Sequence, residues 1–283
     1  MRFALLIALA SLCIAGPRRY SASGLVLAID RRHLTITISH GNIPGLMDAM
    51  AMPFHVRALK SIEGFHAGDN VIFTLFVDRS NSWVEEIRAV PFESAERDPV
   101  QAGRLKVLEL ATGSNQQPQL AARQKAPDFH LIDQDNRPVA LSDFAGKVVA
   151  IDFVYTRCPL PDYCFRLSSN FARLQKRFAA DSRVVFLTVS FDPAHDHPEE
   201  LTRYARIWRA DPKRWHFLTG SPADIRQVCS LFGVGYWPDE GVFTHSLHTV
   251  VLDRERRLVA NIEGNTFSAQ QLGDLIDATL SPE

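Results

Sequence analysis

This sequence has no excess of charge of either sign, and no long apolar run follows its amino-terminal segment. Its 31 lysines and arginines balance 32 aspartates and glutamates over 283 residues, which gives a net charge of −1. Because nucleic acids and anionic membranes attract basic surfaces, we expect no nucleic-acid partner and no basic membrane patch. No later segment reaches the ~18 apolar residues that cross a membrane, so the mature chain should be soluble or tethered by its N-terminus.

Cysteine is also scarce, and one of the four, Cys13, lies in a leader-like segment. One arginine precedes an apolar run over residues 3–14, and small residues follow, as in a signal peptide. We assign residues 1–22 to this leader, with cleavage after Ala15 or a few residues on. Lipidation of Cys13, against which the bulky Leu12 argues, and an uncleaved membrane tether remain alternatives. Each predicts an exported protein, in the periplasm or on the outer face of the cytoplasmic membrane.

Three cysteines remain once the leader is removed: Cys158, Cys164 and Cys229. An odd number in an exported protein means that at least one thiol stays unpaired. Cys158 and Cys164 are near enough in sequence to pair. Cys229 lies at the apolar phase of a predicted helix, and we interpret it as a small buried hydrophobe.

The chain divides into two predicted domains joined by a linker. Residues 23–91 carry five short strands separated by turns, which favours a small all-β barrel of the OB type. Residues 92–124 are polar and mostly without a period, as in a linker. Over residues 125–283 strands and helices alternate, with a hairpin first and an antiparallel pair near the end. This order predicts an α/β domain of the thioredoxin-like type.

Methionine is confined to one place in the mature chain. Met47, Met50 and Met52 lie within six residues, and His40 precedes them at the end of a predicted strand. Met50 and Met52 share one face, because side chains alternate along a strand. Thioether sulfur is a soft ligand suited to Cu(I). Methionine also fills cores, but its confinement beside a histidine favours a metal site.

The stretch SHGNIPGLMDAMAMPF, residues 39–54, resembles the CusF-like periplasmic copper-binding domain. The resemblance covers residues 23–91 and implies Cu(I) held by one histidine and a Met-x-Met pair, here His40, Met50 and Met52. Met47 stands where that family has a capping tryptophan. This difference implies a third thioether in place of a cation–π contact.

Two thiols follow the central strand of the second domain. That strand, Val148–Val154, is a near-continuous apolar run, as expected for a strand covered on both faces. Cys158 and Cys164 lie in the loop after it, at the sheet edge where ligands of α/β proteins gather. His245 precedes another strand reaching that edge, and we favour it over His248 inside the strand. Two thiolates and an imidazole suit Cu(I), or Cu(II) with an added oxygen ligand.

Other interpretations of the cysteine pair remain open. Cys158 and Cys164 can form a structural disulfide or a redox disulfide, and a structural zinc site would need a fourth protein ligand. Thioredoxin oxidoreductases place a proline before the strand that faces their active cysteines. Thr244, His245 and Ser246 include none, which favours a metal ligand at this position.

Residues 126–280 resemble the SCO/SenC family of copper chaperones. The motifs that carry the resemblance are APDFHLIDQDNRPVALSDFAGKVV, DFVYTRCP, SFDPAHDHPEELTRYA, RWHFLTG, FGVGY and THSLHTVVLD, in this order. The family implies a thioredoxin fold, copper held by two cysteines and a histidine, and loading of the Cu-A centre of cytochrome c oxidase. By the motifs the ligands are Cys158, Cys164 and His245. The implied partner is the apo copper subunit of the oxidase or another copper-accepting protein.

The cysteine spacing departs from this family, in which three residues separate the thiols whereas five do here. Phe165 also replaces a proline often found after the second cysteine. A longer loop leaves the sulfurs splayed or more mobile, which bears on delivery more than on copper binding. Asp192 and Asp196, in FDPAHDHP, either support the ligands or form caps and turns.

The sequence therefore predicts an exported copper metallochaperone, rather than an enzyme, with two soft-metal sites. Two rival hypotheses remain. One is a thiol–disulfide oxidoreductase that keeps target cysteines reduced, and the other is a copper-sequestering module without a delivery partner.

Overall fold

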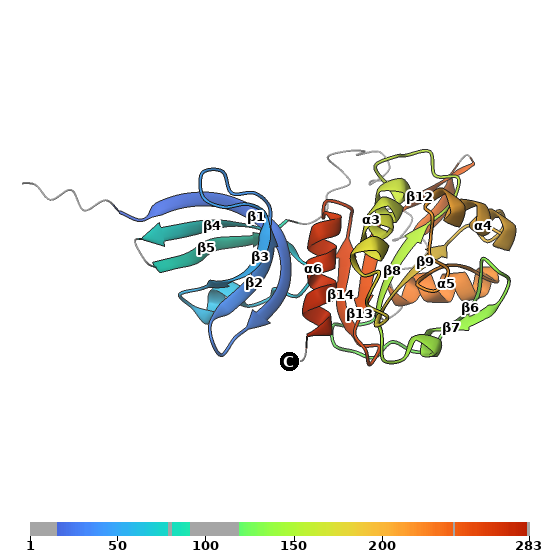
Figure 1. Ribbon diagram of the computed structural model, residues 1–283, viewed down its shortest axis with the longest axis horizontal. Coiled ribbons are helices and arrows are strands. Elements are labelled where there is room, and N and C mark those ends of the chain that lie inside the picture. Colours follow the sequence, from blue (N-terminus) through green and yellow to red (C-terminus); the bar gives the residue numbers. More distant parts are fainter. Residues whose placement is uncertain (1–15, 79–80, 91–118, 240, 282–283) are drawn as a thin grey trace, which may run out of the picture.

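The computed structural model describes residues 16–78, 81–90, 119–239 and 241–281 of the chain. Most of the predicted leader and most of the predicted linker, residues 92–124, lie outside these ranges. Figure 1 shows two bodies side by side, an all-β domain followed by a larger domain of strands and helices. No helix in the described ranges is long and apolar enough to cross a membrane.

The first body, the β domain, contains all five predicted strands in the order β3-β2-β1-β4-β5, with every neighbouring pair antiparallel. A parallel bridge between Val56 and Val84 joins the two edges, and no continuous ladder closes the barrel within the described residues. The first strand includes residues 18–22, which the sequence placed in the leader. The elements are β1 (Arg18–Asp30), β2 (Thr35–His40), β3 (Met50–His55), η1 (Leu59–Ile62), β4 (Asn70–Asp78) and β5 (Asn81–Ala89).

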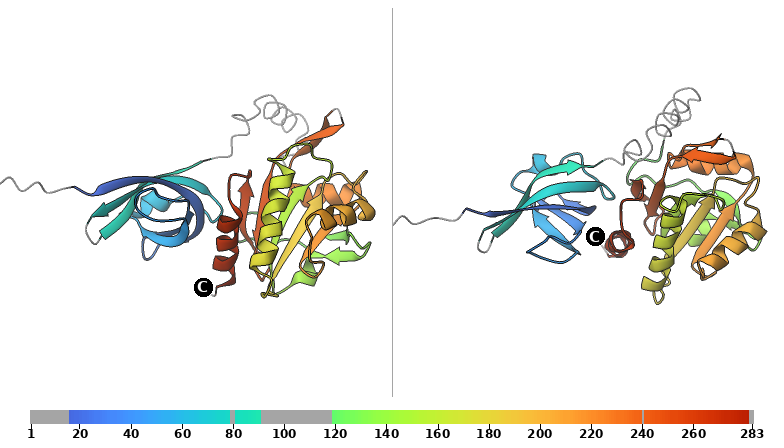
Figure 2. Two further views of the ribbon diagram at one scale, coloured as in Figure 1. Left: turned by 45° about the horizontal axis from the view of Figure 1, so that its top comes forward. Right: turned by 90° about the horizontal axis from the view of Figure 1, so that it is seen from above.

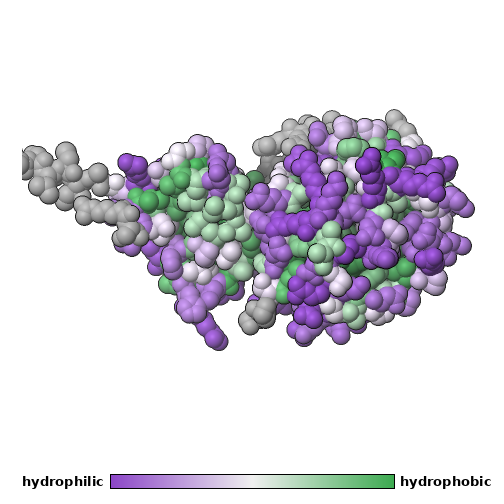
Figure 3. Space-filling model, viewed as in Figure 1, coloured by the Kyte–Doolittle hydropathy of each residue, from purple (hydrophilic) through white to green (hydrophobic). Residues whose placement is uncertain are grey.

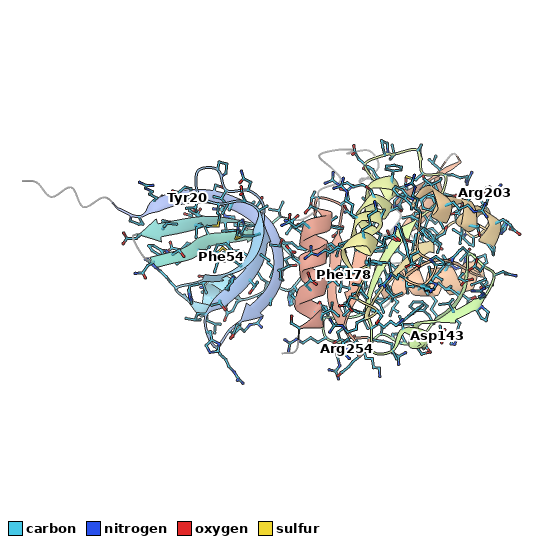
Figure 4. The ribbon with its side chains drawn as sticks, in the orientation of Figure 1. Tyr20, Phe54, Asp143, Phe178, Arg203 and Arg254 are labelled. Carbon is cyan, nitrogen blue, oxygen red and sulfur yellow. The ribbon has the colours of Figure 1, made fainter. Side chains whose placement is uncertain are left out.

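Alternate side chains of these strands form an apolar core that includes Ile38, Phe54 and Phe73. Phe54 is labelled in Figure 4, within the β domain. Gly24 allows β1 to lie unusually close to the end of β2. A Cβ atom at this position would be 2.5 Å from the carbonyl oxygen of Ser39 and 2.8 Å from Cα of His40. Only glycine therefore fits beside His40.

The second body has a seven-stranded sheet in the order β14-β13-β8-β9-β10-β6-β7, in which β8, β9 and β10 are parallel. It is the predicted thioredoxin-like architecture, with α3 and α6 in contact beside the sheet. Its elements are β6 (His130–Asp133), β7 (Pro138–Ala140), η3 (Leu141–Phe144), β8 (Val148–Val154), α3 (Cys164–Arg177), β9 (Val184–Ser190), α4 (Pro198–Ile207), β10 (Trp215–Thr219), α5 (Pro222–Leu231), β11 (Tyr236–Asp239), β12 (Val242–His245), β13 (His248–Leu252), β14 (Leu258–Glu263) and α6 (Ala269–Leu280).

Every residue of β8 and of β9 is buried, as their apolar runs predict for strands covered on both faces. Ser268 caps α6, and Gln271 completes a capping box. The sequence did not predict β11 and β12, two strands that form an antiparallel ribbon ahead of β13. Pro238 and Gly241 signal a turn, and the pairing around them depends on contacts that local sequence does not reveal.

The two bodies are in contact. In both views of Figure 2 the β domain lies against α6, at the edge of the second body where β14 also lies. In the view of Figure 3, hydrophilic residues cover most of the second body, while apolar residues gather on the β domain. Exposed Met50, Leu59 and Ile72 belong to the β domain.

Candidate metal centre

The central strand places two thiols at the carboxyl edge of the sheet. After β8 the chain turns through Tyr155, and Cys158 follows in a loop, half-buried. Cys164 is the first residue of α3 and is completely buried. Because α3 begins at Cys164, the second thiol lies at a helix N-terminus, where the helix dipole favours an anion.

His245 joins these thiols from the end of β12. One ligand atom from each of Cys158, Cys164 and His245 lies within 4.8 Å of the other two, and Cys164 Sγ is 3.9 Å from His245 Nε2. His245 Nδ1 lies 2.9 Å from the carbonyl oxygen of Ser246. Because a carbonyl only accepts, Nδ1 carries the proton and Nε2 presents its lone pair to the sulfurs. This is the tautomer that a metal ligand needs.

The two thiols differ in acidity. Burial raises the pKa of Cys164 well above its ordinary value, and the neighbouring Cys158 raises it further. A hydrogen bond with Cys164, opposed by partial burial and assisted by His245, lowers the pKa of Cys158. Cys158 is therefore the more acidic thiol of the pair, and a soft metal ion that binds both sulfurs must displace the proton that Cys164 retains.

Aromatic rings enclose His245. Its ring centroid lies 4.9 Å from that of Phe191, 5.8 Å from Tyr155 and 6.2 Å from Tyr163. Phe191 and Tyr155 are themselves buried. These rings limit the access of water to the imidazole, which strengthens the preference for a soft, low-coordinate ion. The sequence analysis did not identify them, although two of the three flank the cysteines in the DFVYTRCP and DYC segments.

In the β domain, His40 and Met50 face each other as register partners of β2 and β3. His40 is 1% exposed, and its Nδ1 donates to the carbonyl oxygen of Gly41 at 2.7 Å. Its Nε2 is buried and has no hydrogen-bond partner among the described residues. Met52 is half-buried on the same strand face as Met50, which is exposed. An imidazole lone pair and two thioethers therefore lie at one end of the strand pair.

Met47 is half-buried in the loop between those strands, and its backbone bridges Ile43. The single tryptophan of this domain, Trp83, lies on β5 and is engaged by Arg57 at 3.8 Å and by Phe76 at 5.4 Å. A cap from Trp83 is therefore not available where the predicted third thioether, Met47, lies.

Cys229 and His248, which the sequence did not favour as ligands, lie in surroundings that are typical of structural residues. Cys229 is buried in α5, and burial raises the pKa of its thiol, as expected of a small hydrophobe. His248 is 9% exposed, and its Nδ1 lies 2.9 Å from Asn261 Oδ1. Among the described residues, the group of ligand atoms at this sheet edge contains His245 and not His248.

Comparison with known proteins follows the same division of the chain. Residues 117–280, more than half of the sequence, match the family model described as SCO1/SenC. The chain belongs to the SCO1/SenC family. Residues 19–89 match the model of the copper binding periplasmic protein CusF. Both resemblances that the motifs indicated are confirmed, and with them the thioredoxin-like fold of the SCO1/SenC domain.

Two relatives and one solved structure illustrate the similarity. The "SCO1 protein homolog" of Bacillus subtilis is 31% identical over 101 residues, 35% of this chain and 51% of that protein. "Protein sco1" of Schizosaccharomyces pombe is 29% identical over 150 residues, 50% of this chain and 55% of that protein. The chain thus spans about half the length of these relatives. The SCO1/SenC family lipoprotein from Bacillus anthracis has a TM-score of 0.51 at 25% identity, covering 57% of this chain and 100% of that one.

Asp192 and Asp196 of the SCO1/SenC domain hold the residues that precede Cys158. Asp196 accepts hydrogen bonds from Thr156 N at 2.9 Å, Thr156 Oγ1 at 2.6 Å and Ser190 Oγ at 2.5 Å. Asp192 accepts one from Arg157 Nη2 at 2.7 Å. Both carboxylates are buried. They are occupied by donors of the loop that leads to Cys158, together with Ser190 of β9 and His195.

Replacing Asp196 by alanine should destabilise the SCO1/SenC domain by about 3 kcal/mol, because two donors of Thr156 and the buried hydroxyl of Ser190 lose a charged acceptor. Urea unfolding of the copper-free chain measures this. Glu255→Ala, at an exposed turn, is the matched control and should change the free energy of unfolding by less than about 0.5 kcal/mol. Equal effects of the two substitutions would contradict the structural role of Asp196.

Proposed function

We propose that this protein is an exported copper metallochaperone. Cys158, Cys164 and His245 hold copper in the SCO1/SenC domain, as Cu(I) or as Cu(II) with an added oxygen ligand. Copper is the cargo, and the protein supplies ligands that bind it tightly yet release it by ligand exchange. The observation that carries the proposal is the convergence of two sulfurs and one imidazole nitrogen within 4.8 Å. Such a soft, three-ligand set suits Cu(I), whereas structural zinc wants a fourth ligand.

The β domain supplies an accessory Cu(I) site in this proposal. His40, Met50 and Met52 are its ligands, with Met47 as a further thioether. Support comes from the match of residues 19–89 to the CusF model and from the orphaned lone pair of His40 Nε2. Thioethers stay neutral and bind Cu(I) without a thiolate, so this site can take up the ion in an oxidising compartment.

The acceptor in this proposal is the apo copper subunit of cytochrome c oxidase or another copper-accepting protein. The support is membership of the SCO1/SenC family, whose resemblance implies this acceptor. The place of action is the periplasm or the outer face of the cytoplasmic membrane, either free or through an N-terminal tether. Asp192 and Asp196 assist by fixing the loop that carries Cys158.

Copper titration with X-ray absorption spectroscopy tests the proposal. The mature chain should show two independent Cu(I) sites, one with two sulfurs and one nitrogen and the other rich in thioether. A Cys158→Ser, Cys164→Ser, His245→Ala variant should lose the first site and keep the second. Full copper stoichiometry in that variant would refute a copper site in the SCO1/SenC domain.

A thiol–disulfide oxidoreductase is the second candidate, favoured by the unequal pKa values of the two thiols. The Cys158 thiolate would attack a target disulfide, and the Cys164 thiol would lose its proton and resolve the mixed disulfide. The target would leave with two thiols and the protein with one disulfide. This activity needs both cysteines but not His245. Full reductase activity combined with lost copper affinity in His245→Ala would assign it.

A further inference from the structure

One segment of the SCO1/SenC domain contacts the surroundings of both metal sites. This bridging segment, residues 264–274, runs from the end of β14 into α6. At its start Gly264 N donates to the carbonyl oxygen of Leu247 at 2.8 Å, two residues after His245. The next residue, Asn265, donates from Nδ2 to the carbonyl oxygen of Asp162, within the loop between the two cysteines.

Asn265 is completely buried, and its Oδ1 has no hydrogen-bond partner among the described residues. A buried amide left half-satisfied costs free energy, so the fold bears a penalty to keep Asn265 against the cysteine loop. That loop is the one lengthened relative to the family. Asn265 is a side-chain support for its backbone near Cys164.

The other end of the bridging segment contacts the β domain beside its proposed ligands. Gln271 Nε2 donates to the carbonyl oxygen of Ser39 at 3.0 Å, and Ser39 Oγ donates to Asp274 Oδ2 at 2.7 Å. Gln270 Nε2 donates to the carbonyl oxygen of Ala49 at 3.3 Å. Ser39 and Ala49 immediately precede His40 and Met50.

Besides these hydrogen bonds, closely packed apolar residues join the two domains. Leu25 and Leu27 of β1 belong to the apolar cluster of the SCO1/SenC domain. A Cβ atom on Gly68 would lie 2.7 Å from Cβ of Ala260 and 3.2 Å from Cγ1 of Ile262, both on β14. The β domain therefore packs on the strand before Asn265 and on the helix after it.

We propose that docking of the β domain on β14 and α6 holds Asn265 in place, and that Asn265 in turn positions the loop between Cys158 and Cys164. The β domain is then a structural determinant of the copper centre as well as a second copper site. The inference rests on the proposed function, since it concerns the shape of that centre. Asn265 is a positioning residue, because it acts through the backbone of Asp162.

The test measures the Cu(I) affinity of the cysteine centre alone, in the full chain with Met50→Leu and Met52→Leu. Competition with a coloured Cu(I) chelator under anaerobic conditions gives the affinity. Asn265→Ala should lower it about tenfold, the usual effect of losing a group that orients a ligand. Thr266→Ala, the exposed neighbouring residue, is the matched control and should leave it unchanged.

A second pair of variants separates the domains. Ala260→Glu places a charge in the contact from the SCO1/SenC side, and Gly68→Gln fills it from the β-domain side. Ala278→Glu, on an exposed part of α6, is the control. Small-angle scattering reports separation, and thermal melting reports folding. Separation should lower the Cu(I) affinity of the cysteine centre several-fold. The double variant Ala260→Glu, Asn265→Ala should have no lower affinity than Asn265→Ala alone, because both changes act through the same residue.

The outcomes distinguish the two proposals. If the Met50→Leu, Met52→Leu chain binds no Cu(I), the proposed function fails. If that chain binds Cu(I) but separation of the domains leaves the affinity unchanged, the coupling through Asn265 is wrong. It is also wrong if the affinity losses of Asn265→Ala and Ala260→Glu simply add. Equal affinities of Asn265→Ala and Thr266→Ala would also overturn it.

Discussion

Replacing Cys158 by serine is expected to lower the Cu(I) affinity of the SCO1/SenC domain by about a thousandfold, about 4 kcal/mol. Cys158 is the more acidic thiol of the pair, since its hydrogen bond with Cys164 lowers its pKa. A serine hydroxyl is a hard, neutral oxygen with little affinity for Cu(I). The remaining thiol, Cys164, is one whose pKa burial raises, so it gives up its proton reluctantly.

Cys229→Ser is the control for this substitution, because Cys229 is buried in α5 and takes no part in the centre. Chelator competition on the full chain, with the β-domain site silenced by Met50→Leu and Met52→Leu, measures both. His245→Ala should fall between them, because two sulfurs still bind Cu(I) linearly. A Cys158→Ser chain that binds Cu(I) as tightly as Cys229→Ser would exclude Cys158 as a ligand.

The second large effect concerns Asp152, a carboxylate inside the central strand β8. It is completely buried between Thr188 on β9 and Thr249 on β13, its register neighbours. Neither of its oxygens makes a hydrogen bond within the described residues. Burial raises the pKa of Asp152 to about 7, and the neighbouring Thr188 hydroxyl, which lies outside hydrogen-bond geometry, offsets only part of that rise.

The pH dependence follows from this raised pKa. Below about pH 4 both folded and unfolded chains hold the proton on Asp152. Between about pH 4 and pH 7 the unfolded chain ionises while the folded chain keeps the proton, so stability falls as pH rises through this window. The accumulated loss is on the order of 4 kcal/mol above pH 7.

Asp152→Asn should remove this loss, because an amide does not titrate. The free energy of unfolding of the variant, relative to the parent, should rise by about 3 kcal/mol between about pH 4.5 and pH 8. Urea unfolding of the copper-free chain at both values gives the comparison. Asp78→Asn, an exposed position at the end of β4, is the control. Parallel pH profiles for Asp152→Asn and the parent would show that Asp152 ionises normally in the folded state.

Much of the fold was predictable from local pattern. The near-continuous apolar run of residues 148–154 predicts a central strand, and β8 has these bounds. The ribbon of β11 and β12 was missed, because its pairing competes with the turn signals of Pro238 and Gly241. The start of α3 at Cys164 has no local sequence signal, because its N-cap, Tyr163, makes no side-chain capping bond.

The sequence by itself determined the ligand types. Methionine confined to one strand region, two cysteines after an apolar strand and a histidine before another are chemical facts that spacing alone exposes. The raised pKa of Asp152 was not predictable from the sequence, because it depends on the complete burial of this residue. Asp192 and Asp196 left two interpretations open, since a carboxylate in a turn is equally suited to a metal or to backbone amides.

Only the tertiary structure decided how the ligands meet. His245 lies 81 residues after Cys164 in sequence, and β12 brings its Nε2 within 3.9 Å of that sulfur. The aromatic rings around it come from three separate segments, and the unequal acidity of the thiols follows from the burial of Cys164 and from the hydrogen bond that it makes with Cys158. The contacts of residues 264–274 with both domains are longer in range still. Residue types and spacing specify chemistry locally, whereas distances between remote segments depend on how the whole chain packs.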